Sequence, residues 1–246
     1  MAKFYDFIDL TILCQELIKR NFPKPLMVTG FFVHAAPRIL RVGKCFGPVI
    51  HSCGKSILAG CQLSCSFARG MLWELTAKLA TVDPEYPCAQ HLDDLSHVLV
   101  GETEGGLKSK LVKAGKIVGE EVLGLKLALS EKSTIVPENQ TTKAVVKILN
   151  AAGIPMKTAS TCDDVGVQMS GPLTRRVSTL NARISKGSKR ASRTADLVKI
   201  NPKAKQLTMA ATAKVQPYGH QAQGACMTQQ FAMRANIKKT TPFAGS

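Results

Sequence analysis

The sequence has almost no acidic residues in its C-terminal third, and this deficit is its strongest compositional feature. The chain has 246 residues and a formal net charge of +16. From residue 171 onward there are 14 Lys and Arg but a single acid, Asp196, which gives this part a net charge of +13 and leaves +3 for residues 1–170. Charge concentrated in this way favours a polyanionic partner, either nucleic acid or another anionic surface.

Other features are also missing. No pair of cysteines has the CxxC spacing, and no histidines stand at matching positions, which excludes a zinc-ribbon pattern; Cys53, Cys61 and Cys65 come closest. No apolar run is long enough to span a membrane, and charged residues interrupt the first ten positions where a signal peptide would be apolar. These absences predict reduced thiols and an intracellular protein without a membrane partner, with the nucleus as one expected compartment.

The apolar content is sufficient for a packed core, since 45% of the residues are hydrophobic and the mean hydropathy is +0.03. Helical and alternating patterns occur along the same chain. The clearest helix covers 65–80, where an apolar residue recurs every four positions. The other predicted elements are a helix over 6–20, strands and loops over 26–50, a loop over 51–64, a helix over 107–127, a strand within 123–137, a helix over 142–152, an extended segment over 163–171, and basic helices after Pro172.

Two adjacent aspartates, Asp93 and Asp94, lie in "HLDDL" between short apolar runs with no basic neighbour. Adjacent carboxylates repel each other, so burying them unpaired would destabilise the fold. Two interpretations remain open, a solvated turn and a cation site. If the residues before Asp93 pair with the run 97–100 as a hairpin, both carboxylates lie at its tip, where a metal ion can reach them.

Several motifs occur in one order along the chain. Residues 55–75, "KSILAGCQLSCSFARGMLWEL", resemble a loop-and-helix motif usually written QGxPLSPxLF. "HLDDL" resembles a YxDD hairpin, and its first aspartate follows Gly60 by 33 positions. Residues 124–136, "GLKLALSEKSTIV", resemble a Gly-Leu-x-Leu strand that closes on Glu-Lys-Ser/Thr, and 161–171 fall at a primer-grip turn. In this order the motifs resemble the palm of reverse transcriptases, most closely those of retroelements and group II introns.

The resemblance implies an α+β right-hand polymerase palm over residues 1–172, in which helices back an antiparallel sheet. It implies a basic helical thumb-like region over residues 173–246. The opening "KFYDFID" resembles the family motif Asp-x-x-Lys-Phe-Tyr-Asp, whose first aspartate binds metal. On this chain that aspartate falls one residue before Met1, so we expect the chain to lack it, together with the fingers that precede it in the family.

The resemblance also assigns roles to individual residues. Asp93 would bind Mg²⁺ or Mn²⁺ with Asp94 in support, and Lys132 would give a proton to the departing pyrophosphate. The residues along the deoxynucleotide and template would be Tyr5, which senses the sugar, Gly60, Gln62 and Ser64.

Each of these roles has an alternative. Lys132 could be a solvated side chain, Gly60 a glycine that only starts a helix, and Ser64 an N-cap. A second acidic pair, Asp163 and Asp164, is interpreted as a turn because no flanking hairpin is apparent. The sequence departs from the family pattern at Ala59, Gln62, Cys65 and His91, which affects nucleotide handling but removes no metal ligand.

In the basic region, an apolar stripe of Val177, Leu180 and Ile184 leaves cations on the other side of the helix. In the family this region tracks the backbone of the RNA template and DNA primer. The alternative is a basic face that is only solvated. The predicted backbone contacts are Arg176, Arg183, Lys186, Lys189, Arg190 and Arg193.

The sequence therefore predicts a fragment of an RNA-directed DNA polymerase that would use two-metal nucleotidyl transfer by ancestry and is inactive alone. A second hypothesis is a non-catalytic nucleic-acid-binding remnant of a retroelement protein. A third is a basic structural protein in which the Asp-Asp pair is a chance turn; the order of the motifs favours it least.

Overall fold

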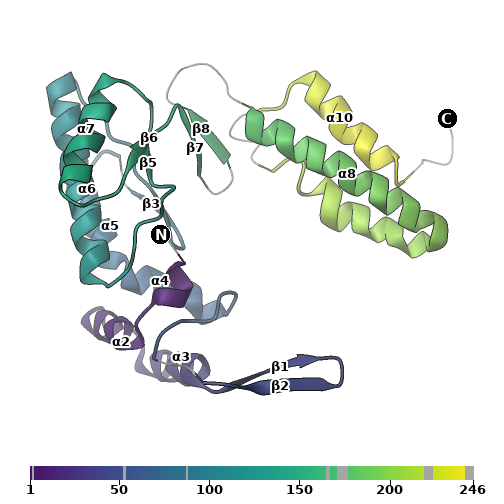
Figure 1. The fold of residues 1–246 in the computed structure, drawn as a ribbon, viewed down its shortest axis with the longest axis horizontal. Helices are drawn as coiled ribbons and strands as arrows, with labels where there is room; N and C mark the ends of the chain where they lie inside the picture. The colour runs from purple at the N-terminus through teal and green to yellow at the C-terminus, as the bar shows by residue number, and fades with distance from the viewer. Residues whose placement is uncertain are drawn as a thin grey trace. The chain divides into compact units, whose positions relative to one another are not determined.

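A computed structural model describes residues 1, 3–51, 54–86, 88–164, 167–170, 177–218 and 224–241 (Figure 1). The chain divides into two compact units. The N-terminal unit comprises residues 1–135 and 139–158, and the C-terminal unit comprises residues 136–138 and 159–246. The fold belongs to the α+β class, as the sequence predicts. The sequence analysis placed a boundary after residue 172, whereas the contacts assign residues 159–170 to the basic unit.

In the N-terminal unit the strands pair two by two. β1–β2 and β3–β4 are antiparallel, and β5–β6 is parallel. No sheet of more than two strands forms among the residues that the structure describes, so the continuous sheet expected of a palm is not seen there. The elements of this unit are α1 (Phe4–Phe7), α2 (Leu10–Lys19), α3 (Lys24–Ala35), β1 (Arg38–Val42), β2 (Cys45–Ile50), α4 (Gln62–Met71), α5 (Trp73–Ala80), β3 (Ala89–His91), β4 (Asp94–Ser96), α6 (Glu104–Gly124), β5 (Thr134–Ile135), α7 (Gln140–Ala151) and β6 (Lys157–Thr158).

The core of this unit lies between its helices. α2 packs against α4, and α5 packs against α6, around side chains that are fully buried. A smaller cluster of Val145, Leu149 and Ile154 joins α7 to α6. Burial of such side chains stabilises the fold by about 1.5–3 kcal/mol each. The largest members of the main core are Phe4, Ile8, Leu13, Leu17, Ile57, Phe67, Met71, Leu72, Leu75 and Leu79.

Two predicted helices differ in their boundaries. The helix expected over 6–20 is interrupted before Leu10, because the Asp9 side chain accepts hydrogen bonds from the backbone N–H groups of Thr11 and Ile12 and so caps a new helix. The helix expected over 65–80 begins at Gln62 and consists of α4 and α5, which meet at the buried residue Leu72.

Strands and loops were predicted over residues 26–50, but residues 26–35 belong to helix α3 (Lys24–Ala35), so this part of the prediction was wrong. Pro25 lies in the first turn, where its missing N–H costs no helical hydrogen bond. Gly30 allows the Phe67 ring of α4 to approach closely: a Cβ built on Gly30 would lie 2.3 Å from the ring. The β-branched and aromatic residues suggested strands, and tertiary packing overrode that preference.

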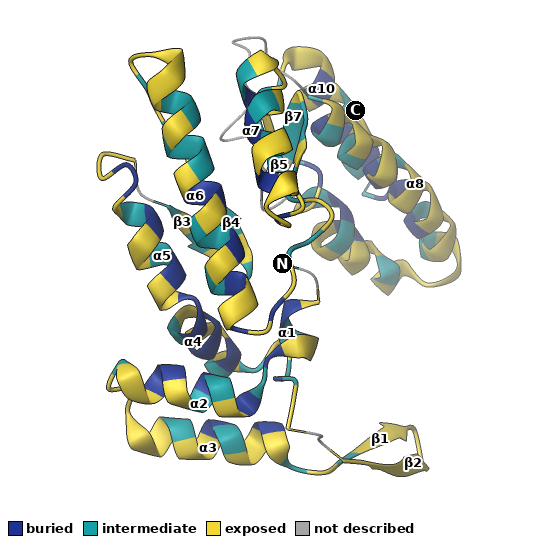
Figure 2. Ribbon diagram, turned by 60° about the vertical axis from the view of Figure 1, so that its left-hand side comes forward, coloured by how far each residue is buried: buried dark blue, intermediate teal, exposed yellow. Residues whose placement is uncertain are grey.

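The following hairpin, β1–β2, confirms the strand prediction for residues 38–50 and extends into solvent (Figure 2). Its apolar side chains are exposed on both strands, among them Leu40, Val42 and Phe46. Arg41 lies over the Phe46 ring at 5.4 Å from its centroid. The neighbouring Phe32 of α3 is 80% exposed. This part of the unit therefore presents an apolar surface to solvent.

The strand predicted within 123–137 is reduced to β5. Helix α6 continues to Gly124, and Lys126 then takes a left-handed conformation, with φ of 55°, that turns the chain away. Only Thr134 and Ile135 pair, in parallel with β6. The alternation of apolar residues was therefore misleading, because the buried Leu125 and Leu127 belong to the helix end and the turn after it.

The C-terminal unit contains the hairpin of β7 (Thr161–Asp164) and β8 (Val167–Ser170), followed by α8 (Ser178–Ile200). A 3₁₀ segment η1 (Pro202–Lys205), a π-helical segment η2 (Thr208–Ala213) and α10 (Met227–Lys238) come next. The second acidic pair, predicted as a turn without a hairpin, lies in β7, so that prediction was wrong: Asp163 pairs with Gln168 and Asp164 with Val167.

The contacts of α8 with α10 and η2 are largely polar. In the predicted apolar stripe only Leu180 is fully buried, and Val177 and Ile184 are half-buried. Instead, hydroxyl and amide groups, most of them buried, bond across the elements. The pairs are Thr208 Oγ1 with Thr240 Oγ1 at 2.6 Å, Asn236 Nδ2 with Gln216 Oε1 at 2.7 Å, and Gln229 Nε2 with Asn181 Oδ1 at 2.7 Å. Hydrogen bonds of this kind favour one alignment of the helices, because breaking one leaves a buried group unpaired.

The close packing of α6 on α7 gives a stability prediction. A Cβ on Gly115 would lie 2.5 Å from a methyl carbon of the buried Leu149, whereas a Cβ on Gly105 of the same helix meets nothing within 4 Å. We expect Gly115→Ala to lower the free energy of unfolding by about 1–2 kcal/mol through overpacking. We expect Gly105→Ala to leave it unchanged or raise it slightly. Urea denaturation of both variants measures the difference, and equal effects would contradict the close approach.

Candidate active site at the Asp93 hairpin

The Asp-Asp pair lies in a short antiparallel hairpin. His91 of β3 pairs with Asp94 of β4, so Leu92 and Asp93 form the turn between them. Leu92 has a φ of 58°, a left-handed conformation that costs a side-chain-bearing residue roughly 1–2 kcal/mol. Gln90 Nε2 donates to the Leu92 carbonyl at 2.8 Å and helps to hold this turn. The hairpin that the sequence predicts is therefore present, with a strained residue at its tip.

The two carboxylates are not equivalent. Asp93 is in the turn and its side chain is 26% exposed, whereas Asp94 begins β4 and is exposed. The sequence analysis placed both at the tip and paired residues 97–100 as a strand, but the paired strand is Asp94–Ser96. Only Asp93 keeps the predicted position.

The start of the chain lies against Asp93. The amino nitrogen of Met1 donates to the Asp93 carbonyl at 3.3 Å and lies 3.8 Å from the carboxylate oxygen Oδ2. A positive group therefore lies beside the Asp93 carboxylate.

The loop that precedes α4 reaches the same place. Ser56 N donates to the Ile8 carbonyl at 2.8 Å, and Ile57 N donates to the Tyr5 carbonyl at 2.9 Å. Burial, and then the nearby negative charges of Cys65 and Asp93, raise the pKa of the Tyr5 phenol above its usual value. The beginning of the chain, the loop with α4, and the hairpin therefore come together around Tyr5, although up to about 90 positions separate them in the sequence.

The loop itself is held by side chains. Leu58 N donates to His34 Nδ1 at 3.0 Å, and the Leu58 carbonyl accepts from Ser64 Oγ at 2.6 Å. Gly60 follows with φ of 88° and open space around its Cα, so its backbone is accessible. Ser64 is buried, and its hydroxyl donates the hydrogen bond that holds the Leu58 carbonyl of the loop. It is not an N-cap, a position that Cys61 takes. Gln62 is exposed at the first position of α4.

Lys132 is not joined to this cluster by any hydrogen bond or ion pair in the part of the chain that the structure describes. It is exposed in the connection between α6 and β5, where its backbone N–H donates to Ser130 Oγ at 3.2 Å. The structure thus brings Tyr5, Asp93 and the loop around Gly60 together and leaves Lys132 outside, which favours its interpretation as a solvated side chain.

The donor atoms near the hairpin suit a hard divalent cation, since carboxylate oxygens are the ligands of Mg²⁺ and Mn²⁺. Magnesium sites often use one or two carboxylates and complete their shell with water and substrate phosphates. Within the described ranges no group of three or more His, Cys, Asp or Glu could hold a metal ion. The residues present therefore fit one end of such a site and depend on further oxygen ligands.

Sequence reasoning missed the residues that fix the chain leaving the hairpin. Asp83, whose side chain is 6% exposed, accepts from Lys110 Nζ at 2.9 Å and from Val100 N at 3.1 Å. Lys110 Nζ also donates to the Val100 carbonyl at 2.7 Å, which ties this segment to α6. His97 Nε2 bonds to the Tyr86 carbonyl at 3.0 Å. We call the bonded group of Asp83, Val100 and Lys110 the clamp. No local sequence pattern reveals it, because its members are distant in sequence.

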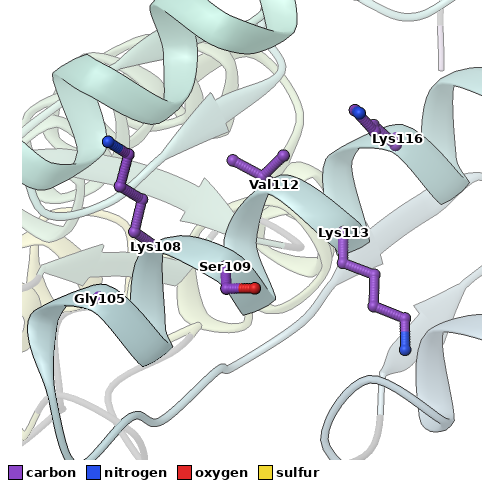
Figure 3. A pocket seen from close by; sticks show the side chains of 6 residues that line it. All are labelled: Gly105, Lys108, Ser109, Val112, Lys113 and Lys116. Atoms are coloured by element: carbon purple, nitrogen blue, oxygen red, sulfur yellow. The ribbon is translucent and has the colours of Figure 1, made fainter.

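A shallow hollow of about 490 Å³ lies along α6, away from these residues in sequence. Figure 3 shows Lys108, Val112 and Lys116 extending from one side of the helix and Lys113 from the other. None of the predicted site residues lines it. Its open shape and lysine side chains are typical of a solvated helix face, and it is not the candidate active site.

The predicted phosphate-binding cations of α8 separate into two sets. Arg183 donates to the Tyr218 carbonyl at 2.7 Å and lies over the Tyr218 ring, and Arg190 donates to the Ala211 carbonyl at 3.1 Å. These two arginines therefore bind the chain that packs on α8. The cations Lys186, Lys189 and Arg193 are exposed and follow one another at helical intervals on the solvent side of α8. Arg176 lies outside the described residues.

No protein-family model, curated protein or solved structure matches this chain. Among the described helices, none combines the length and the apolar character needed to cross a membrane.

The clamp on the hairpin predicts a pH dependence of stability. The hydrogen bonds from Lys110 and then from Val100 lower the pKa of Asp83 below the ordinary value of 3.8. The ionised Asp83 carboxylate therefore contributes its full stabilisation of the folded state above pH 3.8. This contribution is lost as the pH falls through the lowered pKa of Asp83. We expect Asp83→Asn to lower the Tm at pH 7 and to flatten its fall on acidification. Thermal unfolding between pH 7 and pH 2 tests this, with the exposed Glu85→Gln as the control; identical profiles for both variants would contradict the clamp.

Proposed function

We propose that the N-terminal unit corresponds to the palm of a reverse transcriptase, an RNA-directed DNA polymerase, and that this chain alone does not extend a primer. The observation that carries the proposal is the convergence of three separate motifs around Tyr5: the chain start, the loop with α4, and the Asp93 hairpin. A chance Asp-Asp turn gives no reason for the other two motifs to meet it.

The residues of the site have distinct tasks in this proposal. Asp93 would hold a Mg²⁺ or Mn²⁺ ion with a carboxylate placed before Met1, and Asp94 would support the hairpin. A divalent cation bound there would stabilise the attacking and leaving oxygens of nucleotidyl transfer. Tyr5 would contact the sugar of a deoxynucleotide. The open backbone at Gly60 would allow the template to approach closely.

Metal binding tests the geometry at Asp93 directly. An extension that places Asp immediately before Met1 replaces the terminal ammonium by a peptide and adds a carboxylate next to Asp93. The same extension with Asn is the matched control. We expect the Asp form to bind Mn²⁺ about tenfold more tightly, which corresponds to roughly 1.4 kcal/mol. Titration calorimetry with Mn²⁺ alone measures the difference, and Asp93→Asn should abolish it. Equal affinities of the Asp and Asn forms would refute the site.

The chain as it stands presents no third carboxylate at the hairpin among its described residues, so we expect no extension of a DNA primer on an RNA template with deoxynucleotides and Mg²⁺ or Mn²⁺. A primer-extension assay at matched concentrations of the chain and its Asp93→Ala variant measures this. Extension by the chain that disappears in the variant would overturn the proposal that the chain alone is inactive.

A second function, nucleic-acid binding without catalysis, is favoured by the charge of the C-terminal unit. Three cations face solvent on one side of α8, while the two arginines at its flank maintain the packing of the unit. Exposed cations on a rigid helix suit phosphate contacts that do not depend on base sequence. This function holds whether or not the Asp93 hairpin binds metal.

The solvent-facing stripe gives a quantitative prediction. Replacing Lys186, Lys189 and Arg193 by Ala should weaken binding to an RNA–DNA duplex and reduce the slope of log K against log salt by about 2–3. The control replaces Lys199, Lys203 and Lys205, which removes the same charge from the end of α8 and from η1. Binding is measured by fluorescence anisotropy at salt concentrations from about 50 to 200 mM. Equal effects of both triple variants would show that net charge, and not this face, drives binding.

A further inference from the structure

The Leu58 peptide is held from both sides by side chains of two helices. On one side its N–H donates to Nδ1 of His34 in α3 at 3.0 Å. On the other side its carbonyl accepts from the hydroxyl of Ser64 in α4 at 2.6 Å. Both side chains are buried, His34 completely. Two residues further on, Gly60 turns the chain in a left-handed conformation with its backbone open to solvent.

His34 can accept this hydrogen bond only as a neutral imidazole. Nδ1 must present its lone pair to the Leu58 N–H, so the ring proton is on Nε2. Burial and then the Arg38 guanidinium lower the pKa of His34 below 6.5, which favours the neutral ring at physiological pH. Protonation of Nδ1 would place two N–H donors against each other and break the bond.

Among the described residues, Arg38 is the charged group that acts on His34. Arg38, at the start of β1, donates from Nη2 to the His34 carbonyl at 2.7 Å. From α4 the imidazole faces the Phe67 ring, whose centroid is 5.7 Å away, and from the loop it faces the Leu58 amide. Neither of these titrates. The protonation of His34 is therefore opposed by burial and by Arg38, and no carboxylate contacts it among the described groups.

We propose that His34 is a positioning residue, and that its neutral ring fixes the loop of residues 58–62 in the shape that meets the template and nucleotide. The role in positioning a ligand rests on the proposed function, whereas the control of the loop does not. The Ser64 hydroxyl alone leaves the Leu58 N–H without a partner, so loss of the imidazole acceptor opens the loop. Because protonation of His34 breaks its bond to Leu58, the loop is closed above pH 6.5. It opens as the pH falls through the lowered pKa of His34.

A comparison of the unchanged chain with the variants His34→Asn and His34→Leu distinguishes the positioning role of His34 from an effect on overall stability. His34→Asn places an amide oxygen near the position of Nδ1 and cannot titrate between pH 5 and 8. His34→Leu fills the space but has no acceptor. In the unchanged chain, hydrogen exchange at the Leu58 amide, corrected for its intrinsic rate, should rise about tenfold for each unit by which the pH falls towards the His34 pKa. It should level off below that pKa, because exchange follows the protonated fraction.

The expected result is slow exchange at Leu58 in His34→Asn at both pH 7.5 and pH 5, and fast exchange in His34→Leu at both. Amides of α6, such as that of Gly115, should not change and report global unfolding. Slow exchange at Leu58 in His34→Leu, or a loss of protection at Gly115 that matches that at Leu58, would overturn the proposal.

The same samples distinguish this proposal from the proposed function. An RNA–DNA template–primer with a deoxynucleotide should protect the Gly60 amide at pH 7.5 in the unchanged chain and in His34→Asn, but not in His34→Leu. If Leu58 follows the expected pH profile and the template–primer protects Gly60 in no chain, control of the loop by His34 stands and the nucleic-acid role of the loop fails. Protection of Gly60 in His34→Leu would show that the loop closes without the imidazole, against the proposal.

Discussion

Backbone hydrogen bonds between the beginning of the chain and residues 54–57 hold the candidate site together. Leu10 N donates to the Gly54 carbonyl, Ser56 N to the Ile8 carbonyl and Ile57 N to the Tyr5 carbonyl, at 2.8–3.0 Å. This short antiparallel contact lies over side chains that are fully buried, among them Ile8 and Ile57. This contact joins Tyr5 to the loop before α4, and the Met1 amino group in turn bonds to the Asp93 carbonyl of the hairpin.

Burial and hydrogen bonding perform different tasks around this contact. Phe67 fills the space between α3 and α4, where its ring stacks on Phe31 at 5.7 Å and lies beside His34. That packing determines how close the two helices come, and the polar atoms of His34 and Ser64 then determine where the loop lies between them. A dense apolar core tolerates little displacement, so a loop bonded to two such helices inherits their rigidity. The segment that leaves the hairpin is held by the hydrogen bonds of Val100 with Asp83 and Lys110.

The two units differ in how they are stabilised. The N-terminal unit is built around large apolar side chains, while α8, α10 and η2 meet through buried amides and hydroxyls. A polar contact surface favours one alignment of the helices, because any displacement leaves buried donors and acceptors unpaired. In the C-terminal unit this alignment leaves the side chains of Lys186, Lys189 and Arg193 facing solvent. Arg183 and Arg190 instead donate hydrogen bonds to backbone carbonyls within the unit. Cations that look alike in the sequence therefore have different tasks.

The sequence by itself determined the α+β class, the positions of most helices, the hairpin at the Asp-Asp pair and the concentration of positive charge after residue 171. These follow from periodicity, capping residues and composition, which act over a few neighbouring positions. Tertiary structure decided the rest. Residues 24–35 form a helix that packs closely on α4, since Gly30 has no side chain to block the Phe67 ring. The Ser64 hydroxyl supports the loop because it donates a hydrogen bond to the Leu58 carbonyl. His34, Asp83 and Lys110 gained their roles from partners 17 to 27 positions away. No local pattern encodes such contacts, because they depend on which surfaces the packed helices bring together.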